Sequence, residues 1–364
     1  MNKIKFAIIG CGRISHKHIK ALVNSAHAAT LVGVCDLNIE KALSCKLEYE
    51  SFFKEFDKVS AYDNYEEMIE KEDVDVVAIA TESGYHAKIA TYCMNRGKHV
   101  IVEKPMALSI KDADDMIRCS SINKVKLGIC HQNRFNSAVL KLKNAIDCNK
   151  FGKVTNGTAR ILWNRDMSYY EQALWRGTWA LDGGTLMNQC IHNIDLLQWM
   201  LGGDVESVYA QCDKYLRGIE AEDFGAIIIR FRNKTIGIIE GSACVYPSNL
   251  EETLSIFGEK GTVVIGGIAV NEVLTWKFKG ENEEMIKLLL NEKIDNVYGN
   301  GHMYLYEDFI NCIFENRLPL IHGEEGKKAL SIVLAAYKSQ LTSSLVKFPL
   351  EEFSTAEMSG WKQM

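Results

Sequence analysis

The sequence predicts an α/β protein in which a doubly wound parallel sheet is followed by an α+β domain with a broad, mostly antiparallel sheet. Over the first 130 residues, strand-like and helix-like segments alternate, and a glycine turn joins the first strand to the first helix. Such alternation is typical of a parallel sheet. After Phe151, strand-like segments follow one another with short breaks, as in an antiparallel sheet. We therefore expect two domains, at residues 1–130 and 131–364.

The N-terminal elements are predicted from their apolar patterns. The segment 74–80 (VDVVAIA) is almost continuously apolar, as expected of a strand buried on both faces of a parallel sheet. The helix predicted to start at Tyr85 ends before Gly97, because glycine commonly terminates helices. The expected strands are 5–9, 31–36, 74–80, 99–103 and 127–131, and the expected helices are 14–25, 40–50 and 85–96.

The C-terminal elements change in character. Turn signals such as Glu259-Lys260-Gly261 separate short apolar runs. One helix interrupts this region early, at 186–200, and two helices, at 303–315 and 325–342, close the chain. The expected strands are 205–212, 225–231, 235–245, 252–257, 262–265 and 273–278.

Composition and charge narrow the classes of function. The net charge is −5 with a pI of about 6.0, and no basic stripe is present that would track a phosphate backbone, so nucleic acid is not an expected partner. The 11 cysteines include no CxxC pair, which favours free thiols in a reducing cytoplasm. No apolar run reaches the ~18 residues of a membrane span, and the N-terminus lacks the apolar region of a signal peptide.

The run Gly10-Cys11-Gly12-Arg13-Ile14-Ser15 is a glycine turn between a predicted strand and a predicted helix. Gly10 permits the tight turn, Gly12 lets the backbone approach a pyrophosphate, and the helix N-terminus favours the anion. Asp36 ends the second strand, 24 residues after Gly12, where a carboxylate accepts hydrogen bonds from ribose hydroxyls and repels a 2′-phosphate. This pattern predicts a Rossmann domain that binds NAD rather than NADP. The competing interpretation is a structural turn with an unrelated surface aspartate.

Two further runs suggest a reaction centre. Val102-Glu103-Lys104-Pro105 follows a parallel strand and so lies at the edge of the sheet where ligands bind. Lys104 there can lower the cost of deprotonating a substrate hydroxyl. Taken alone, the run is equally compatible with an ordinary surface lysine after a strand. In the predicted helix 186–200, Asn188, His192 and Asp195 share one face. Histidine suits the base of an alcohol oxidation, and the competing interpretation is a capping and hydrogen-bonding network.

Taken together, these motifs resemble the glucose–fructose oxidoreductase/inositol dehydrogenase (Gfo/Idh/MocA) family over nearly the whole chain. Within it, the sequence is most similar to the UDP-N-acetylglucosaminuronate 3-dehydrogenases of bacterial surface-sugar pathways. The stretches that carry this resemblance are GCGRI, EKP, Gln132-Asn133-Arg134, Tyr169-Tyr170, Trp175-Arg176-Gly177-Thr178-Trp179, Asp182-Gly183-Gly184, 187–192, Asn249-Leu250-Glu251, 258–262, Gly266-Gly267 and 270–272. One departure is Glu82, which stands between Thr81 and His86 where the family often has proline.

The resemblance implies NAD-dependent oxidation of the C3 hydroxyl of a UDP-linked N-acetylglucosaminuronate by a homodimer or homotetramer. Lys104 would polarise the hydroxyl, His192 would be the base, and Asn188, where many members have aspartate, would orient the substrate. The expected cofactor-binding residues are Gly10, Gly12, Arg13, Ile14, Asp36, Thr81, His86, Glu103, Lys104, Gln132, Trp175 and Arg176. The expected substrate-binding residues are Lys104, Arg134, Tyr169, Asn188 and His192.

Three other functions compete with this interpretation. A free-sugar or inositol dehydrogenase of the same family would share Lys104 and His192, but Asn188 and the matches at 258–272 favour the nucleotide sugar. A dinucleotide-binding regulator without chemistry would need neither Lys104 nor His192. A zinc enzyme is suggested only by His16-Lys17-His18, which has no cysteine or carboxylate cluster nearby in the sequence, so no metal is expected.

Overall fold

The computed structural model describes residues 3–53, 59–202, 204–267, 269–280 and 300–361. The chain divides into two compact units, each with its own sheet. Unit 1 comprises Met1–Ala107, Lys111–Gln132 and Gly301–Lys327. Unit 2 comprises Leu108–Ile110, Asn133–Asn300 and Lys328–Met364. Among the described residues, no helix is both long and apolar enough to cross a membrane.

Unit 1 contains a six-stranded parallel sheet in the order β3-β2-β1-β4-β5-β6. From β1 the chain adds β2 and β3 on one side of the sheet and then β4, β5 and β6 on the other. At such a switch point, between β1 and β4, a crevice for ligands is expected at the carboxyl ends of the two strands. The strand bounds are β1 (Ile4–Ile9), β2 (Ala29–Cys35), β3 (Ser60–Tyr62), β4 (Val76–Ile79), β5 (His99–Val102) and β6 (Leu127–Ile129). This confirms the predicted doubly wound sheet.

Two helices of unit 1, α2 and α3, begin at asparagine caps. Asn38 and Asn64 accept hydrogen bonds from backbone N–H groups in the first turns of α2 and α3, which is the usual role of asparagine at a helix N-terminus. The helix bounds are α1 (Ser15–Asn24), α2 (Ile39–Glu50), α3 (Tyr65–Lys71), α4 (His86–Met94), α5 (Ile110–Ile122) and α11 (Gly301–Phe314).

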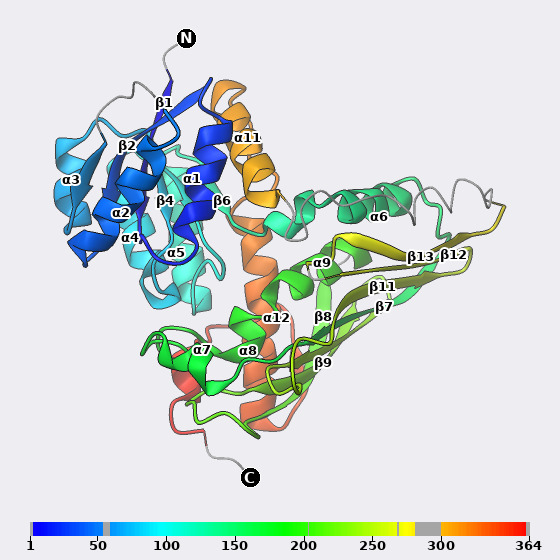
Figure 1. Cartoon of the computed structure of the whole chain (residues 1–364). Helices are drawn as coiled ribbons and strands as arrows, with labels where there is room; N and C mark the ends of the chain where they lie inside the picture. The colour runs from blue at the N-terminus through cyan, green and yellow to red at the C-terminus, as the bar shows by residue number, and fades with distance from the viewer. Residues whose placement is uncertain (1–2, 54–58, 203, 268, 281–299, 362–364) are drawn as a thin grey trace. The chain divides into compact units, whose positions relative to one another are not determined.

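Helix α11 follows unit 2 in the sequence but packs in unit 1, beside α1 (Figure 1). The Tyr306 ring stacks on Phe6 of β1 with ring centroids 5.5 Å apart. The Phe309 ring lies where a side chain on Gly128 of β6 would be, because a Cβ there would be 2.8 Å from the ring. The predicted second domain, 131–364, is therefore corrected: residues 301–327 complete the N-terminal unit.

Unit 2 contains an eight-stranded sheet in the order β13-β12-β11-β7-β10-β9-β8-β14. All neighbouring pairs are antiparallel except β7 with β10, which is parallel, so the broad, mostly antiparallel sheet is confirmed. Strand β7 was not predicted from the sequence, although it pairs with both β10 and β11. The bounds are β7 (Val154–Leu162), β8 (Val205–Asp213), β9 (Phe224–Phe231), β10 (Ile236–Ser242), β11 (Glu251–Gly258), β12 (Gly261–Gly266), β13 (Glu272–Phe278) and β14 (Val346–Lys347).

One face of this sheet is covered by α9. The Leu197 side chain packs so closely on Gly157 of β7 that a Cβ there would lie 2.9 Å away. The opposite face carries exposed apolar side chains, including Tyr209, Ile228 and Ile238. The helix bounds in unit 2 are α6 (Ser137–Asp147), α7 (Met167–Glu171), α8 (Gly184–Asn188) and α9 (Ile191–Leu201), and α12 (Gly323–Thr342) extends into this unit.

The single helix predicted at 186–200 is wrong, because the chain forms two helices separated at Gln189 and Cys190. The N–H groups of Gln189 and Cys190 both donate to the carbonyl of Thr185. Sharing one acceptor ends α8 and lets α9 start in a new direction. Consequently Asn188 and His192 do not lie on one continuous helix face.

The docking of α11 on β6 predicts a specific sensitivity at Gly128. In Gly128→Ala, the new methyl group meets the buried Phe309 ring, and overpacking of this kind costs about 1–3 kcal/mol. Urea unfolding of the cofactor-free protein should show this loss. The matched control is Gly12→Ala, which adds the same methyl group where no atom lies within 4 Å. Equal stability of the two variants would contradict the placement of Phe309.

Candidate active site

The glycine turn of unit 1 has the shape that a dinucleotide requires. Gly10 adopts φ +95°, and a Cβ on it would lie 2.5 Å from the carbonyl of Ala80, so only glycine fits between the ends of β1 and β4. Gly12 has no atom within 4 Å of the position of a Cβ, which leaves the approach to its backbone open. Ser15 donates to the Gly12 carbonyl over 2.7 Å at the start of α1. The turn therefore presents free backbone at a helix N-terminus, as a pyrophosphate site does.

Asp36 is held beside this turn. Its Oδ2 accepts a hydrogen bond of 2.9 Å from the N–H of Cys11, and its Oδ1 accepts one of 2.9 Å from the N–H of Asn38. These contacts fix a half-buried carboxylate at the end of β2, next to the glycine turn. This is where a carboxylate contacts the adenosine ribose of a bound dinucleotide. Arg13 is exposed and Ile14 half-buried at the same turn.

The loop after β4 has, at Glu82, a backbone conformation that a proline could also adopt. This residue adopts φ −60° and ψ 142°, which is the backbone conformation of a proline. His86 is buried, and its Nδ1 lies 2.8 Å from the carbonyl oxygen of Pro105, with Nε2 3.1 Å from that of Thr81. Burial lowers the pKa of His86 and so favours the neutral ring. A neutral ring carries one N–H, and we assign it to Nδ1, because the contact with the carbonyl of Pro105 is the shorter of the two. His86 thus ties two loops together, and its predicted cofactor contact stays a prediction.

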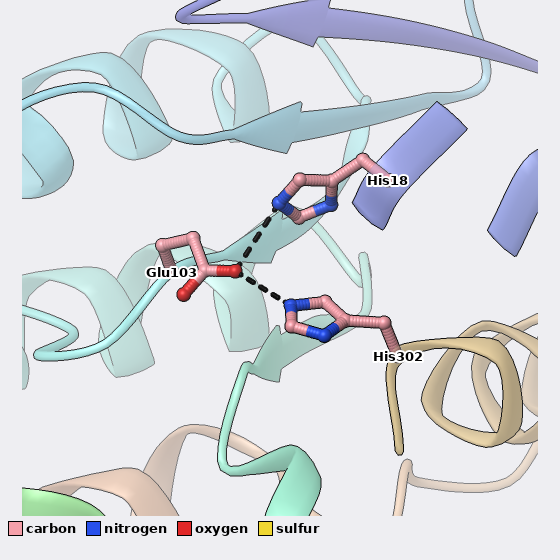
Figure 2. Close-up of side chains that lie close together, drawn as sticks. All are labelled: His18, Glu103 and His302. Atoms are coloured by element: carbon pink, nitrogen blue, oxygen red, sulfur yellow. Dashed lines mark hydrogen bonds and ion pairs between the residues drawn. The ribbon is translucent and has the colours of Figure 1, made fainter. Parts of the chain in front are cut away.

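Glu103 is buried, and Figure 2 shows both histidine rings approaching the same oxygen of its carboxylate. Oε1 accepts a hydrogen bond of 2.9 Å from Nε2 of His302 and lies 3.2 Å from Nε2 of His18. Oε2 accepts a hydrogen bond of 3.2 Å from the backbone N–H of Lys104. Burial alone would raise the pKa of Glu103, but the two histidines outweigh this and hold it well below its ordinary value. The side chain predicted to contact the cofactor therefore points into unit 1.

His18, Glu103 and His302 are also the one group of potential metal ligands that comes together among the described residues, with ligand atoms within 4.8 Å of one another. Two histidines and a carboxylate are suitable ligands for a transition metal. However, both Nε2 atoms approach the same carboxylate oxygen at distances typical of hydrogen bonds and ion pairs. The group is therefore held by one hydrogen bond, from His302, and one close polar contact, from His18.

In unit 2, a polar network joins the residues around the break between α8 and α9. Asn188 donates through Nδ2 to Oδ1 of Asp182, and its Oδ1 accepts a hydrogen bond of 2.8 Å from Gln189. The Gln189 amide also donates to the hydroxyl of Tyr169 over 2.9 Å, and Asp182 accepts from the N–H of Gly177 over 2.7 Å. The WRGTW, DGG and NQ motifs thus form one connected structure.

Two arginines flank Tyr169. The guanidinium of Arg176 lies 4.2 Å from the centroid of its ring, and that of Arg165 lies 5.3 Å away. Arg165 also donates to Oε1 of Gln189 over 3.1 Å. Both arginines and Tyr169 are only half-buried. This group, which we call the arginine–tyrosine cluster (Arg165, Tyr169, Arg176), offers two positive charges, held against one aromatic ring, to an anionic ligand. Arg165 was missed because it lies in no motif.

The second glycine of the DGG motif is explained by Glu222, a buried residue that sequence reasoning missed. Gly184 adopts φ +91°, and a Cβ there would lie 1.7 Å from Oε2 of Glu222. Oε1 of Glu222 accepts hydrogen bonds from the N–H of Leu186 at 2.7 Å and from the hydroxyl of Tyr337 at 3.0 Å. Burial raises the pKa of Glu222 to about 8, so this carboxyl is largely protonated at neutral pH. It anchors the start of α8.

Arg134 and Asp195, two residues assigned to the site from the sequence, lie in the core of unit 2. Their side chains form a bidentate ion pair, with Nε to Oδ2 at 2.7 Å and Nη2 to Oδ1 at 2.6 Å. Both residues are fully buried. This contradicts the predicted substrate contact of Arg134 and the predicted polar stripe that included Asp195. The pair instead attaches α9, which carries His192 in its first turn, to the 3-10 segment Gln132–Phe135.

The remaining predicted residues are placed as follows. Lys104 is half-buried, two residues beyond β5, and the Lys104–Pro105 peptide bond is cis. His192 is half-buried at the start of α9. Thr81, Gln132 and Trp175 are half-buried in loop or 3-10 segments. Their contacts with cofactor and substrate remain predictions.

Comparison with known proteins agrees with these features. Residues 4–131 match the oxidoreductase family with an NAD-binding Rossmann fold, and residues 139–264 match the GFO/IDH/MocA C-terminal domain. Two solved structures are WlbA dehydrogenases in complex with NADH and UDP-GlcNAcA. The protein from Bordetella pertussis is 35% identical with a TM-score of 0.86, covering 96% of this chain and 100% of that one. The protein from Chromobacterium violaceum is 35% identical with a TM-score of 0.87, covering 96% and 97%.

A curated relative shows how broad the family is. The myo-inositol 2-dehydrogenase of Thermotoga maritima is 26% identical over 356 residues, which cover 96% of this chain and 99% of that protein. These relatives are dehydrogenases, and the glycine turn of this chain fits the dinucleotide they use. The chain therefore belongs to the Gfo/Idh/MocA family of NAD-dependent oxidoreductases.

Proposed function

We propose that this enzyme oxidises the C3 hydroxyl of a UDP-linked N-acetylglucosaminuronate with NAD⁺, in the synthesis of a surface-polysaccharide sugar. The observation that carries the proposal is the 35% identity, over 96% of the chain, with two dehydrogenases whose structures hold NADH and UDP-GlcNAcA. The arginine–tyrosine cluster supports it, because a uronate and a diphosphate are both anionic and a guanidinium binds such groups well.

Inositol oxidation is the second candidate function. It is supported by the similarity to the Thermotoga maritima enzyme, which extends over 356 residues. An uncharged polyol, however, would have no use for two half-exposed guanidinium groups beside Tyr169. The cluster thus favours an acidic substrate over inositol.

The proposed chemistry divides between two side chains. His192 takes the proton of the reacting hydroxyl as general base, and Lys104 stabilises the developing alkoxide charge. Bound NAD⁺ supplies the hydride acceptor. Asn188 is an uncharged amide and cannot act as a base, so we assign it to substrate orientation. Its Nδ2 and Oδ1 are engaged by Asp182 and Gln189, which hold the side chain in place.

The proposed cofactor site lies on unit 1. Gly10, Gly12, Arg13 and Ile14 would face the pyrophosphate, and Asp36 the adenosine ribose. The nicotinamide half would contact Thr81, Lys104 and Gln132. The cofactor contacts expected of Trp175 and Arg176 stay predictions from the sequence. The exposed apolar side chains on the open sheet face support the predicted pairing with a second copy of the chain, and a cytoplasmic location remains the expectation.

Cofactor preference tests the role of Asp36. NADH should bind at least about tenfold more tightly than NADPH, because the 2′-phosphate would approach a fixed carboxylate. Fluorescence titration measures both affinities, and Asp36→Ala should narrow the difference. Asp63→Ala, which removes an exposed carboxylate just beyond the neighbouring strand β3, is the matched control and should leave the preference intact. Equal affinities in the unmodified enzyme would remove the ribose role of Asp36.

Substrate class is tested by NADH formation with a panel of sugars. We expect kcat/KM to be highest for UDP-N-acetylglucosaminuronate, lower for UDP-N-acetylglucosamine, which lacks the carboxylate, and lowest for myo-inositol. The nucleotide provides remote binding energy that positions the sugar. Arg165→Gln should reduce the advantage of the acidic sugar. A higher kcat/KM for myo-inositol than for any UDP-sugar would replace the proposal with the second candidate.

The catalytic assignments predict separable kinetic defects. His192→Asn should lower kcat by about 10²–10⁴-fold, the usual contribution of a general base, while NADH affinity stays nearly unchanged. Lys104→Ala should lower kcat and raise KM, because this lysine also orients the hydroxyl. In the unmodified enzyme, kcat/KM for oxidation should fall towards low pH as the base becomes protonated, and this decline should vanish in His192→Asn. An unaltered rate and pH profile in that variant would make His192 structural.

A further inference from the structure

We infer that the buried side chains of His18, Glu103, His302 and Tyr306 form a positioning device for Lys104. This goes beyond the proposed function, and it rests on that function for the catalytic role of Lys104. The four residues come from three elements of unit 1: α1, the turn after β5, and α11. We refer to them as the histidine–glutamate network.

The network reaches Lys104 through the backbone. Oε2 of Glu103 accepts the N–H of Lys104, and Oε1 is held by His302 at 2.9 Å and faced by His18 at 3.2 Å (Figure 2). On the far side of Lys104, the carbonyl of Pro105 is held by His86 at 2.8 Å. The peptide group that precedes Lys104 and the one that follows Pro105 are therefore held by buried partners, which restricts the direction in which the Lys104 side chain leaves the turn.

The hydrogen atoms of the network can be assigned consistently. The Tyr306 hydroxyl donates to Nδ1 of His18, 2.7 Å away, which leaves the proton of the neutral ring on Nε2, facing Glu103. His302 donates from Nε2 to the same carboxylate oxygen. This arrangement requires a neutral His18 and an ionised Glu103, which agrees with the lowered pKa of His18, a consequence of burial, and with the lowered pKa of Glu103.

The network links two parts of the proposed site, α1 and the turn that carries Lys104, to a third element, α11. His18 lies one turn into α1, the helix whose N-terminus faces the expected pyrophosphate. His302 stands 199 residues from Glu103 in the sequence, at the start of α11. A helix distant in the chain thus supplies a hydrogen bond to the turn that carries Lys104. A purely space-filling role would not need a donor at this position, where Nε2 of His302 faces a carboxylate oxygen.

The test compares two variants at His302 with a control on the same helix. His302→Gln keeps an N–H donor that reaches as far as Nε2, whereas His302→Leu keeps the bulk and removes the donor. Tyr304→Leu changes an exposed residue of α11 and serves as control. Steady-state kinetics, NADH titration and thermal melting are measured for all three.

We expect His302→Leu to lower kcat by about 10- to 100-fold, the scale of a misplaced reacting group, with NADH affinity within about threefold. His302→Gln should recover most of the lost rate, and the control should match the unmodified enzyme. Equal kcat in the Gln and Leu variants, or a loss of rate explained by unfolding alone, would overturn the inference. A stoichiometric bound transition metal that is lost in His302→Leu would also overturn it, in favour of a metal centre.

Hydrogen–deuterium exchange separates this inference from the proposed function, because it needs no substrate. In peptides that cover residues 103–106, His302→Leu should accelerate exchange at least about tenfold over His302→Gln and the control, since the amide of Lys104 loses a fixed acceptor. Unchanged exchange would refute the network even if the enzyme proved active on UDP-sugars. Accelerated exchange in an enzyme that oxidises inositol instead would preserve the network and refute only the substrate.

Discussion

The N-terminal unit depends on how it accommodates one buried negative charge. Moving a carboxylate out of water costs several kcal/mol unless partners replace the lost solvation, and Glu103 is only 7% exposed. Its partners are two histidine side chains and a backbone amide, so α1 and α11 must both pack against the end of β5. This requirement adds to the apolar packing of Tyr306 and Phe309 in holding α11 in the N-terminal unit, to which the chain returns after passing through the second sheet.

Unit 2 accommodates its buried charges in two other ways. Arg134 and Asp195 neutralise each other in a bidentate pair, which fixes the position of α9. Glu222 accepts hydrogen bonds from two neutral donors, the N–H of Leu186 and the hydroxyl of Tyr337, and burial raises its pKa to about 8, which favours the neutral form. The first solution fixes the helix that carries His192, and the second fixes the start of the helix that carries Asn188. The helices that carry His192 and Asn188 are therefore both held in place by buried polar groups.

The sequence predicted the features whose causes are local and not those whose causes are distant. Gly10 and Asp36 were recognised because a tight turn and a carboxylate after the second strand leave a short, regular pattern. Strand β7 was missed because its run, VTNGTARIL, is only half-buried and contains polar residues and a glycine. The break between α8 and α9 was missed because no glycine or proline marks it. Arg134 was misassigned because its partner Asp195 stands 61 residues away in the sequence. A basic residue in a motif that resembles the family is easily taken for a ligand contact when the sequence does not reveal the carboxylate that pairs with it.

Glycines show how the two units use the same physical device for different ends. At Gly10 the missing Cβ lets two strand ends approach, and at Gly184 it makes room for the carboxyl of Glu222; a side chain at either position would disturb the protein itself. At Gly12 the missing Cβ leaves space that no atom of the protein fills. A glycine that the fold does not need, within a turn that otherwise needs one, is best explained by a ligand that approaches the backbone there. The contrast between Gly10 and Gly12 thus separates the part of the motif that shapes the turn from the part that receives the dinucleotide.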